Sequence, residues 1–500
     1  MRRRAFLRGA AAAAVVGTAG RVREGLGQSR DRELPPGFTV LRATQGEITI
    51  DGKTARVFHL LQDDGAQGYV GVKGQRFRVA LDNATPGPLS VHWHGLILPN
   101  GQDGVPYVTQ RPLTPGERRL YDFPLEQAGT YWMHSHWGLQ EQSMMTAPLI
   151  LRDPSGPPDE HDVVMMLNDF TARDPAAILA DLRGRGQGAP RPGSGRAGMT
   201  KMPAPAMSGM AMAGPDLNDV RYDAFLANRR PLSDPQVIRV LPGRTVRLRI
   251  INAASGTNFF IRTGALRAEA IAVDGADIAP LPGRVFELAV AQRIDLRVTI
   301  PRGAGAYPIL AQGEGTDMRA GLVLATPDAS TRPISARASR AAGALSNAQE
   351  KRLVPLRPLA PRAVDRTIRV GLNGDMARYT WTLNGRAWPD IVPLAVRKGE
   401  RVEIAFANET GMAHPMHLHG HVFQVTEIDG MRRRGAMRDT VLVLPRQTIK
   451  VEFDAAYPGY WMIHCHLLYH QAAGMMTVLR YEGFDDPAYD PRESLAEFKH

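Results

Sequence analysis

The 500-residue sequence contains a single cysteine, Cys465, and no run of apolar residues long enough for a membrane span. One cysteine excludes an intramolecular disulfide, so the fold is stable without one. The small-residue run from Gly9 to Gly20 is far shorter than the roughly 20 apolar residues that a spanning helix requires. The formal net charge of +11 is accompanied by no base-reading motif, which excludes the common nucleic-acid-binding modules.

The remaining composition is typical of a folded protein with many turns. Hydrophobic residues make up 43% and charged residues 22%, with 50 Gly and 38 Pro. This balance predicts strands and loops and excludes a disordered chain or a helical bundle. The length is too great for one hydrophobic core and indicates about three domains.

The N-terminal segment Arg2-Arg3-Arg4-Ala5-Phe6-Leu7-Arg8 precedes the small-residue run. It resembles a twin-arginine signal, which exports proteins already folded and often loaded with cofactor. We therefore expect a periplasmic protein, or one otherwise exported by this route. An ordinary basic tail is the alternative interpretation.

A repeated pattern predicts three related β-domains. Val-x-x-Gly, an alternating apolar stretch and an Asn nine residues after the Gly occur three times, with the first valine one residue nearer its glycine. The copies are Val72, Gly74 and Asn83; Val240, Gly243 and Asn252; and Val396, Gly399 and Asn408. Alternation of this kind is typical of a strand with one buried face, and copies about 160 residues apart indicate repeated domains.

We predict domain boundaries of 31–157, 158–330 and 355–490, after a signal and lead at 1–30. Residues 184–215 form a Gly-, Pro- and Met-rich insertion, and residues 326–362 connect to the third domain. A second repeat separates the outer domains from the middle one. Gly129 and Gly459 each precede a His by five residues, at His134 and His464, whereas the corresponding middle position is Leu310. The outer domains should therefore hold the chemistry.

Histidines are concentrated in His-x-His pairs. Fourteen histidines placed at random would give about 0.4 such pairs (498 × (14/500)²). Five occur: His92/His94, His134/His136, His417/His419, His419/His421 and His464/His466. Chance does not explain this number, so the histidines predict metal binding.

The segment around Cys465 predicts two separate metal sites. On a strand, His464 and His466 point to one face and Cys465 to the other. His470 and Met475 follow closely, and His414 lies in the other histidine-rich segment. Two imidazoles, a thiolate and a weak thioether are the ligands of a blue-copper electron-transfer site.

Four segments together resemble the copper signatures of the multicopper oxidases across nearly the whole mature chain. They are His92-Trp93-His94-Gly95, His134-Ser135-His136, His414-Pro415-Met416-His417-Leu418-His419-Gly420, and His464-Cys465-His466-Leu467-Leu468-Tyr469-His470 with Met475. The resemblance implies an all-β fold of three cupredoxin-like Greek-key sandwiches. It also implies a laccase-like oxidoreductase that takes single electrons from a substrate and reduces dioxygen to water.

The same resemblance implies four copper ions. His414, Cys465, His470 and Met475 would hold the type 1 copper, and His92 and His417 the type 2 copper. The type 3 pair would be held by His94, His134, His136, His419, His464 and His466. His59, His161, His421 and His500 have no place in this scheme.

Proton supply is less well defined by the sequence. Asp103 matches the family's acidic residue near the type 2 copper and is our candidate, although an Asp before a Gly is also typical of a turn. Many bacterial relatives place a Glu directly after the second type 1 histidine, but this chain has Gln471, which cannot titrate. Another acid or a water chain must then deliver protons, or turnover is slower.

The substrate is predicted from the insertion. It contains Met199, Met202, Met207, Met210 and Met212, and thioethers prefer Cu(I). Together with Gln140-Glu141-Gln142, it is similar to periplasmic copper-resistance oxidases and favours oxidation of Cu(I). Phenol oxidation in the laccase manner, copper sequestration with little turnover, and a copper-free structural role are the alternatives. We expect a monomer with a small reducing substrate and dioxygen as its partners.

Overall fold

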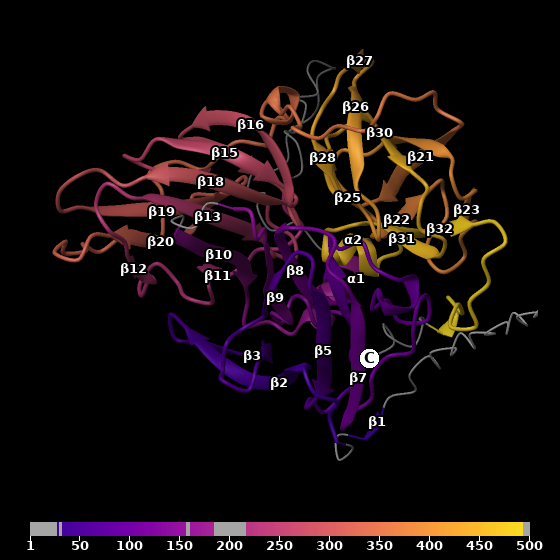
Figure 1. The fold of residues 1–500 in the computed structure, drawn as a ribbon, viewed down its shortest axis with the longest axis horizontal. Helices are drawn as coiled ribbons and strands as arrows, with labels where there is room; N and C mark the ends of the chain where they lie inside the picture. Colours follow the sequence, from indigo (N-terminus) through magenta and orange to yellow (C-terminus); the bar gives the residue numbers. More distant parts are fainter. Residues whose placement is uncertain (1–27, 30–32, 157–160, 185–216, 494–500) are drawn as a thin grey trace, which may run out of the picture.

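The computed structural model describes residues 28–29, 33–156, 161–184 and 217–493 (Figure 1). Strands dominate these residues and form three pairs of packed sheets, which confirms the all-β fold of three sandwich domains. Figure 1 shows the first domain in indigo and purple, the second in magenta and salmon, and the third in orange and yellow. No helix in the described ranges is long and apolar enough to cross a membrane.

The first domain packs the sheet β1-β7-β5-β2-β3 against the sheet β4-β9-β8-β6. Its elements are β1 (Gln28–Ser29), β2 (Thr39–Ile50), β3 (Lys53–Leu61), β4 (Tyr69–Val72), β5 (Arg76–Asn83), β6 (Val91–His94), η1 (Asn100–Gln102), β7 (Glu117–Pro124), β8 (Gly129–Ser135) and β9 (Thr146–Arg152).

The second domain packs the sheet β11-β10-β13-β18-β15-β16 against the sheet β12-β20-β19-β14-β17. Its elements are β10 (His161–Phe170), α1 (Pro175–Gly184), β11 (Ala224–Ala227), β12 (Val237–Arg239), β13 (Thr245–Asn252), β14 (Phe259–Arg262), β15 (Ala268–Val273), β16 (Ala276–Gly283), β17 (Val285–Leu288), β18 (Arg293–Thr299), β19 (Ala306–Gly313) and β20 (Arg319–Ala325). η3 (Glu350–Arg352) lies in the connector to the third domain.

The third domain packs the sheet β22-β21-β24-β30-β26-β27, with β28 beside β26, against the sheet β23-β32-β31-β25-β29. Its elements are β21 (Arg366–Asp375), β22 (Thr380–Leu383), β23 (Leu394–Val396), β24 (Arg401–Asn408), β25 (His414–Leu418), β26 (Phe423–Ile428), β27 (Met431–Arg432), β28 (Met437–Arg438), β29 (Thr440–Val443), β30 (Thr448–Asp454), β31 (Tyr460–Cys465), α2 (Leu468–Ala472) and β32 (Met476–Tyr481). The predicted boundaries of the three domains stay a prediction.

The sequence repeat marks the same strand in each domain. β5, β13 and β24 run parallel to β2, β10 and β21 and antiparallel to β7, β18 and β30, respectively. Each ends on the repeated asparagine: Asn83, Asn252 and Asn408. The amide of each donates to carbonyls of the loop that follows and of a distant segment, Leu113, Leu288 and Val443 respectively. The asparagine recurs because one buried side chain ties the strand end to two loops.

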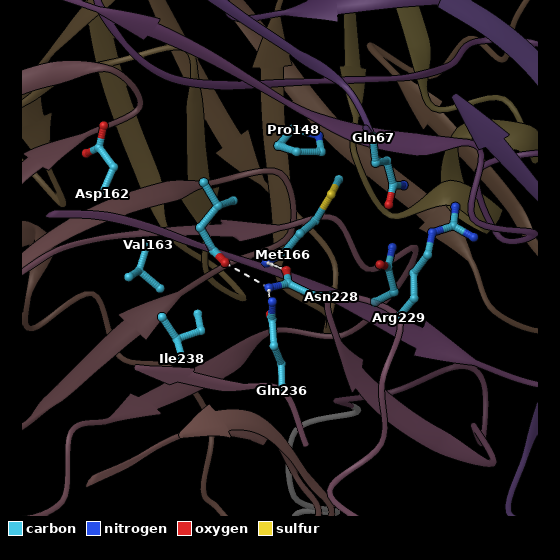
Figure 2. Close-up of a pocket in the computed structure, with 11 residues that line it drawn as sticks. Gln67, Pro148, Asp162, Val163, Met166, Asn228, Arg229, Gln236 and Ile238 are labelled. Carbon is cyan, nitrogen blue, oxygen red and sulfur yellow. Dashed lines mark hydrogen bonds between the residues drawn. The ribbon is translucent and has the colours of Figure 1, made fainter. Parts of the chain in front are cut away.

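A cavity of about 400 Å³ lies between the first and second domains (Figure 2). Polar side chains that line it form hydrogen bonds with other parts of the protein. The Asn228 side chain accepts from the Met166 amide and donates to Val164 and to Gln236. Arg229 donates across the boundary to the carbonyls of Phe58 and Met144, both at 2.6 Å. The cavity is therefore part of the interface between the first and second domains.

Candidate metal centre

β31 and the residue that follows it place His464 and His466 on one side and Cys465 on the other. β31 pairs antiparallel with β25, placing His417 opposite His464, and the His466 amide donates to Pro415 at 2.7 Å. His464 Nε2 lies 3.0 Å from His419 Nε2 on one side. On the other side, the Cys465 Sγ lies beside a different pair of imidazoles. The strand period therefore divides the site into two groups joined by two peptide bonds.

The sulfur-containing group consists of His414, Cys465 and His470, all fully buried. Cys465 Sγ lies 3.6 Å from His414 Nδ1 and 3.8 Å from His470 Nδ1, and these two nitrogens are 3.2 Å apart. The short helix α2 turns His470 back towards β31. Met475 is fully buried, and its carbonyl accepts the Cys465 N–H at 3.0 Å. Three soft or borderline donors thus converge on one point beside a thioether residue.

The outer edges of these two imidazoles are held by other side chains. Thr410 Oγ1 lies 2.7 Å from His414 Nε2, and Asp219 Oδ2 lies 2.8 Å from His470 Nε2. Trp381 stacks on the His470 ring with 3.9 Å between centroids. Because the Nε2 atoms are bonded outward, the Nδ1 atoms are left to face the sulfur. No sequence signal pointed to Asp219 or Trp381.

The second group brings together eight histidines from the outer domains. β6 carries His92 and His94, and β8 with the residue after it carries His134 and His136. His417, His419, His464 and His466 come from β25, β31 and the residues that follow them. All eight are buried, and triplets such as His92/His417/His419 and His136/His419/His464 place their nitrogens within 4.8 Å of one another. The structure therefore brings together all eight predicted histidines.

The ring nitrogens of these histidines are suited to bind metal ions, because several have no hydrogen-bond partner and most of the rings have a lowered pKa. Among the described residues, the buried atoms without a hydrogen-bond partner include His92 Nε2, His136 Nε2, His417 Nε2 and both ring nitrogens of His466. Burial, and then neighbouring imidazoles, hold the pKa values of most of the group well below the ordinary value. Burial lowers the pKa of His464 to about 3. Neutral imidazoles with unused lone pairs are ready ligands for metal ions.

The Cys465 thiol is also suited to a metal ion, but in its deprotonated form. Burial raises the pKa of Cys465 well above its ordinary value, so the sulfur stays protonated without a metal. A bound metal ion displaces that proton because the thiolate is the coordinating form. The donor set of the sulfur-containing group is suited to a soft or borderline metal such as copper.

Three buried acids surround the eight histidines, and each links the first domain to the third. Asp103 lies 3.1 Å from His92 Nδ1 and 2.8 Å from His419 Nδ1. Glu141 lies 2.8 Å from His134 Nδ1 and 3.8 Å from His466 Nδ1. Asp439 Oδ1 lies 3.1 Å from His94 Nε2, and its carbonyl lies 2.8 Å from His417 Nδ1. The acids therefore hold the outer edges of five imidazoles, and Glu141 lies near the sixth, His466, without a hydrogen bond.

Only the first of these acids was a predicted site residue. Gly104, which follows Asp103, has a φ of +86° and packs directly against the Val91 carbonyl. A Cβ at this position would lie 1.9 Å from the carbonyl oxygen, so only glycine allows the close approach that brings Asp103 to the site. Glu141 belongs to the Gln140-Glu141-Gln142 segment that resembled copper-resistance oxidases, and its place five residues after His136 was a usable signal. Burial raises the pKa of Glu141 well above its ordinary value. Asp439 follows an unremarkable arginine and had no signal.

The remaining predicted residues are placed as follows. Gln471 lies buried in α2 beside His470, so no acid occupies that position. His421 is buried against the His419 carbonyl and the Tyr481 hydroxyl, and His161 is exposed at the start of β10. The five methionines of the insertion, Met199, Met202, Met207, Met210 and Met212, and His500 lie outside the described residues.

Comparison with known proteins agrees with this geometry. Three family models, each described as multicopper oxidase, match residues 44–156, 161–327 and 362–483. A multicopper oxidase of Mycobacterium tuberculosis is 32% identical over 82% of this chain and 80% of that protein. Copper resistance protein A of Pseudomonas syringae pv. tomato is 26% identical over 96% and 99%.

A solved laccase from Botrytis aclada superposes with a TM-score of 0.70 at 22% identity, covering 92% of this chain and 90% of that one. This likeness shows a shared fold. The sequence identity to the mycobacterial oxidase, the three matched segments and the cupredoxin fold lead to one conclusion. The chain belongs to the multicopper oxidase family, copper-dependent oxidoreductases that use dioxygen as the electron acceptor.

Proposed function

We propose that this chain couples one-electron oxidation of Cu(I) at a type 1 site to four-electron reduction of dioxygen at a trinuclear site. His414, Cys465, His470 and Met475 are assigned to the type 1 copper, and His92 and His417 to the type 2 copper. The type 3 pair is assigned to His94, His134, His136, His419, His464 and His466. The observation that carries this assignment is the His464-Cys465-His466 strand, whose sulfur and imidazoles face two separate donor groups.

Bound copper supplies reversible one-electron exchange at each site, and four such ions together store the electrons that dioxygen needs. The protein's own residues provide the path and the environment. An electron delivered at the His470 edge reaches Cys465, and the two adjacent peptide bonds lead to His464 and His466. All eight histidines are buried, which keeps most bulk water away from the second group. Overall, 4 Cu(I), O₂ and 4 H⁺ give 4 Cu(II) and 2 H₂O.

Protons must reach the second group from its surroundings. Asp103 remains our candidate for this supply, because its carboxylate bonds one histidine of each outer domain. Glu141 is a second acid in a comparable place, at the edge of the type 3 ligands. Either acid could supply protons in place of the Glu that many relatives have at the position of Gln471.

Metal analysis and spectroscopy test the assignment. A copper-loaded preparation should hold about four ions per chain, show the intense visible absorption of a copper–thiolate bond, and give a separate type 2 paramagnetic signal. Absence of the thiolate absorption, or copper far below four per chain, would overturn the proposal. Copper bound with no oxygen consumption from any donor would favour sequestration.

Two features support Cu(I) as the donor. Asp219 places a carboxylate on the outer edge of His470, where an electron from outside would enter, and a carboxylate attracts a cation more than a neutral phenol. The methionines of the insertion end at Met212, seven positions before Asp219 in the sequence, so soft donors that suit Cu(I) precede this carboxylate in the chain. Oxidation of phenols, as the name laccase implies for the Botrytis protein, is the alternative.

Paired donors distinguish the two. Oxygen consumption is measured with Cu(I) and with a substituted phenol, for the parent chain and for a variant lacking residues 199–212. A loss confined to Cu(I) supports the methionine assignment, and equal losses contradict it. Asp219→Asn should raise the KM for Cu(I) more than the KM for a neutral phenol, since it removes a charge and keeps the shape.

Export through the twin-arginine route and a monomeric state complete the proposal. The paired arginines that suggest this route lie outside the described residues. Replacing Arg3 and Arg4 with lysine should leave the protein in the cytoplasm of a host that has this route. Light scattering of the purified chain tests the monomer.

A further inference from the structure

We infer that Arg293 of the middle domain is a positioning residue for the trinuclear site, acting through Asp439 on one histidine from each outer domain. The middle domain supplies none of the eight histidines, and its Leu310 occupies the place of the outer domains' histidine. The inference rests on the proposed copper assignment and adds a role for the domain without ligands.

Arg293 opens β18 and is fully buried at the junction of the three domains. Its Nη1 donates to Asp439 Oδ1 at 2.8 Å, and its Nη2 donates to the other oxygen of the same carboxylate. Its Nε donates to the carbonyl of Thr130 in the first domain at 3.1 Å. The guanidinium thus spans from the second domain to both of the others.

Asp439 in turn holds two histidines, one through its carboxylate and one through its backbone carbonyl. Asp439 Oδ1 accepts from His94 Nε2, so the Nδ1 of this ring is left to face the metal-binding space. The Asp439 carbonyl accepts from His417 Nδ1, which leaves His417 Nε2 without a partner among the described residues. A change in the Asp439 conformation therefore changes the tautomer and orientation of two assigned ligands.

Close packing around this contact leaves it little freedom. Gly95, directly after His94, has a φ of +87°, and a Cβ there would lie 2.6 Å from both Arg293 Nη2 and Asp439 Oδ2. The preceding residue of the middle domain adds a second bond, from Gln292 Nε2 to the Thr440 carbonyl at 3.0 Å. Two consecutive side chains of the middle domain thus fix two consecutive residues of the third.

The chemistry requires arginine in particular. Its planar fork matches a carboxylate through two parallel bonds and cannot lose its proton, whereas a lysine offers a single point of charge. Asp274 accepts the Arg293 amide at 2.9 Å and pairs with Arg438, and Arg438 also pairs with Glu350. The guanidinium is therefore the central cation of a buried network, and its orientation is determined from several sides.

A matched control lies in the same domain. Arg249 is also a buried arginine of the middle domain and also bonds Thr130, through Oγ1 at 3.0 Å, but its acids are Asp162 and Asp295 rather than Asp439. Loss of Arg249 weakens the packing of the first and second domains without touching the Asp439 carboxylate.

The test compares Arg293→Lys, Arg293→Gln and Arg249→Lys in the full copper-loaded chain. We expect both Arg293 variants to lose 10- to 100-fold in copper retention against a chelator, within the range of about 10–100-fold for lost outer-shell partners. Their type 2 paramagnetic signal should change while the copper–thiolate absorption stays the same. Arg249→Lys should lower the Tm and leave both signals as in the parent chain.

A parent-like type 2 signal and parent-like copper retention in Arg293→Lys and Arg293→Gln would overturn the inference. An equal spectral change in Arg249→Lys would also overturn it, because a general packing effect would then be sufficient. If the Arg293 variants fail to accumulate, Asp439→Asn is measured instead, with the arginine in place. An altered type 2 signal in this variant supports the inference, and a parent-like signal overturns it. Copper or thiolate absorption missing from the parent chain refutes the proposed function instead.

Discussion

Replacing Asp103 with asparagine tests whether the acid between the outer domains holds the second metal group. The substitution keeps the shape and replaces one acceptor oxygen with an NH₂ donor. Asp103 Oδ2 accepts from His419 Nδ1 at 2.8 Å, and Oδ1 lies 3.1 Å from His92 Nδ1. The amide therefore meets an imidazole N–H with a donor at one of these two places, whichever way it is turned.

The size of the effect follows from the contacts. The carbonyl of the same residue also accepts from His92 at 2.9 Å, so the asparagine will place its NH₂ on that side and keep an oxygen for His419. The bond from His419 then loses its charge assistance and the NH₂ faces the His92 N–H, which together cost about 1.5–3 kcal/mol, or roughly 10- to 150-fold in copper affinity of the second group. The type 1 group should be unchanged, because Asp103 contacts none of its residues within the described ranges.

Chelator titration of the copper-loaded variant measures this loss, with oxygen consumption and the copper–thiolate absorption followed in parallel. Asp295→Asn is the control, since Asp295 is a buried acid that pairs with Arg247 and Arg249 and not with an imidazole. It should lower stability and leave copper retention unchanged. Parent-like copper retention and turnover in Asp103→Asn would refute the assigned role.

Three further changes test separate parts of the structure. Cys465→Ser should abolish the copper–thiolate absorption and oxygen consumption while about three coppers per chain remain, and metal analysis that finds fewer would argue against two independent groups. Glu141→Ala removes the acceptor of His134 Nδ1 and should reduce copper retention by about 10-fold, less than for an unsupported ring because the Ser135 carbonyl lies 3.0 Å from the same nitrogen. Asn252→Ala removes two bonds to carbonyls and one from an amide and should lower the free energy of unfolding by about 2–4 kcal/mol, with copper content per folded chain as in the parent, so a changed copper spectrum would count against its purely structural role.

The candidate ligands could be proposed from the sequence because they come in short segments whose members lie close together in the chain. His464, Cys465 and His466 are consecutive, and strand alternation alone is sufficient to place their side chains on opposite faces. The repeated asparagines predicted the domains for a similar reason, since each bonds a loop that begins within a few residues of it. The spacing of residues in the sequence predicts contacts only where the contacting residues lie near one another in the chain.

The residues that hold the ligands could not be predicted in this way. Asp439 contacts His94 across 345 positions of sequence, and Asp219 contacts His470 across 251. Neither residue belongs to a motif, and an isolated aspartate is most often a turn or surface residue. Their role depends on how three domains pack, which neither composition nor periodicity reports.

The charge of the site explains why such acids are needed. Eight neutral imidazoles contribute no negative charge, and divalent ions placed among them in a dry interior carry a large desolvation cost. Asp103 and Glu141 offset part of that charge from the outer edges of the rings, where they leave the metal-facing nitrogens unused, whereas the charge of Asp439 is paired with that of Arg293. Each of the three bridges the first and third domains, so the compensating charge is complete only when these domains are docked. The middle domain also takes part, because its Arg293 pairs with Asp439; within the described ranges, no cation of that domain pairs with Asp103 or Glu141.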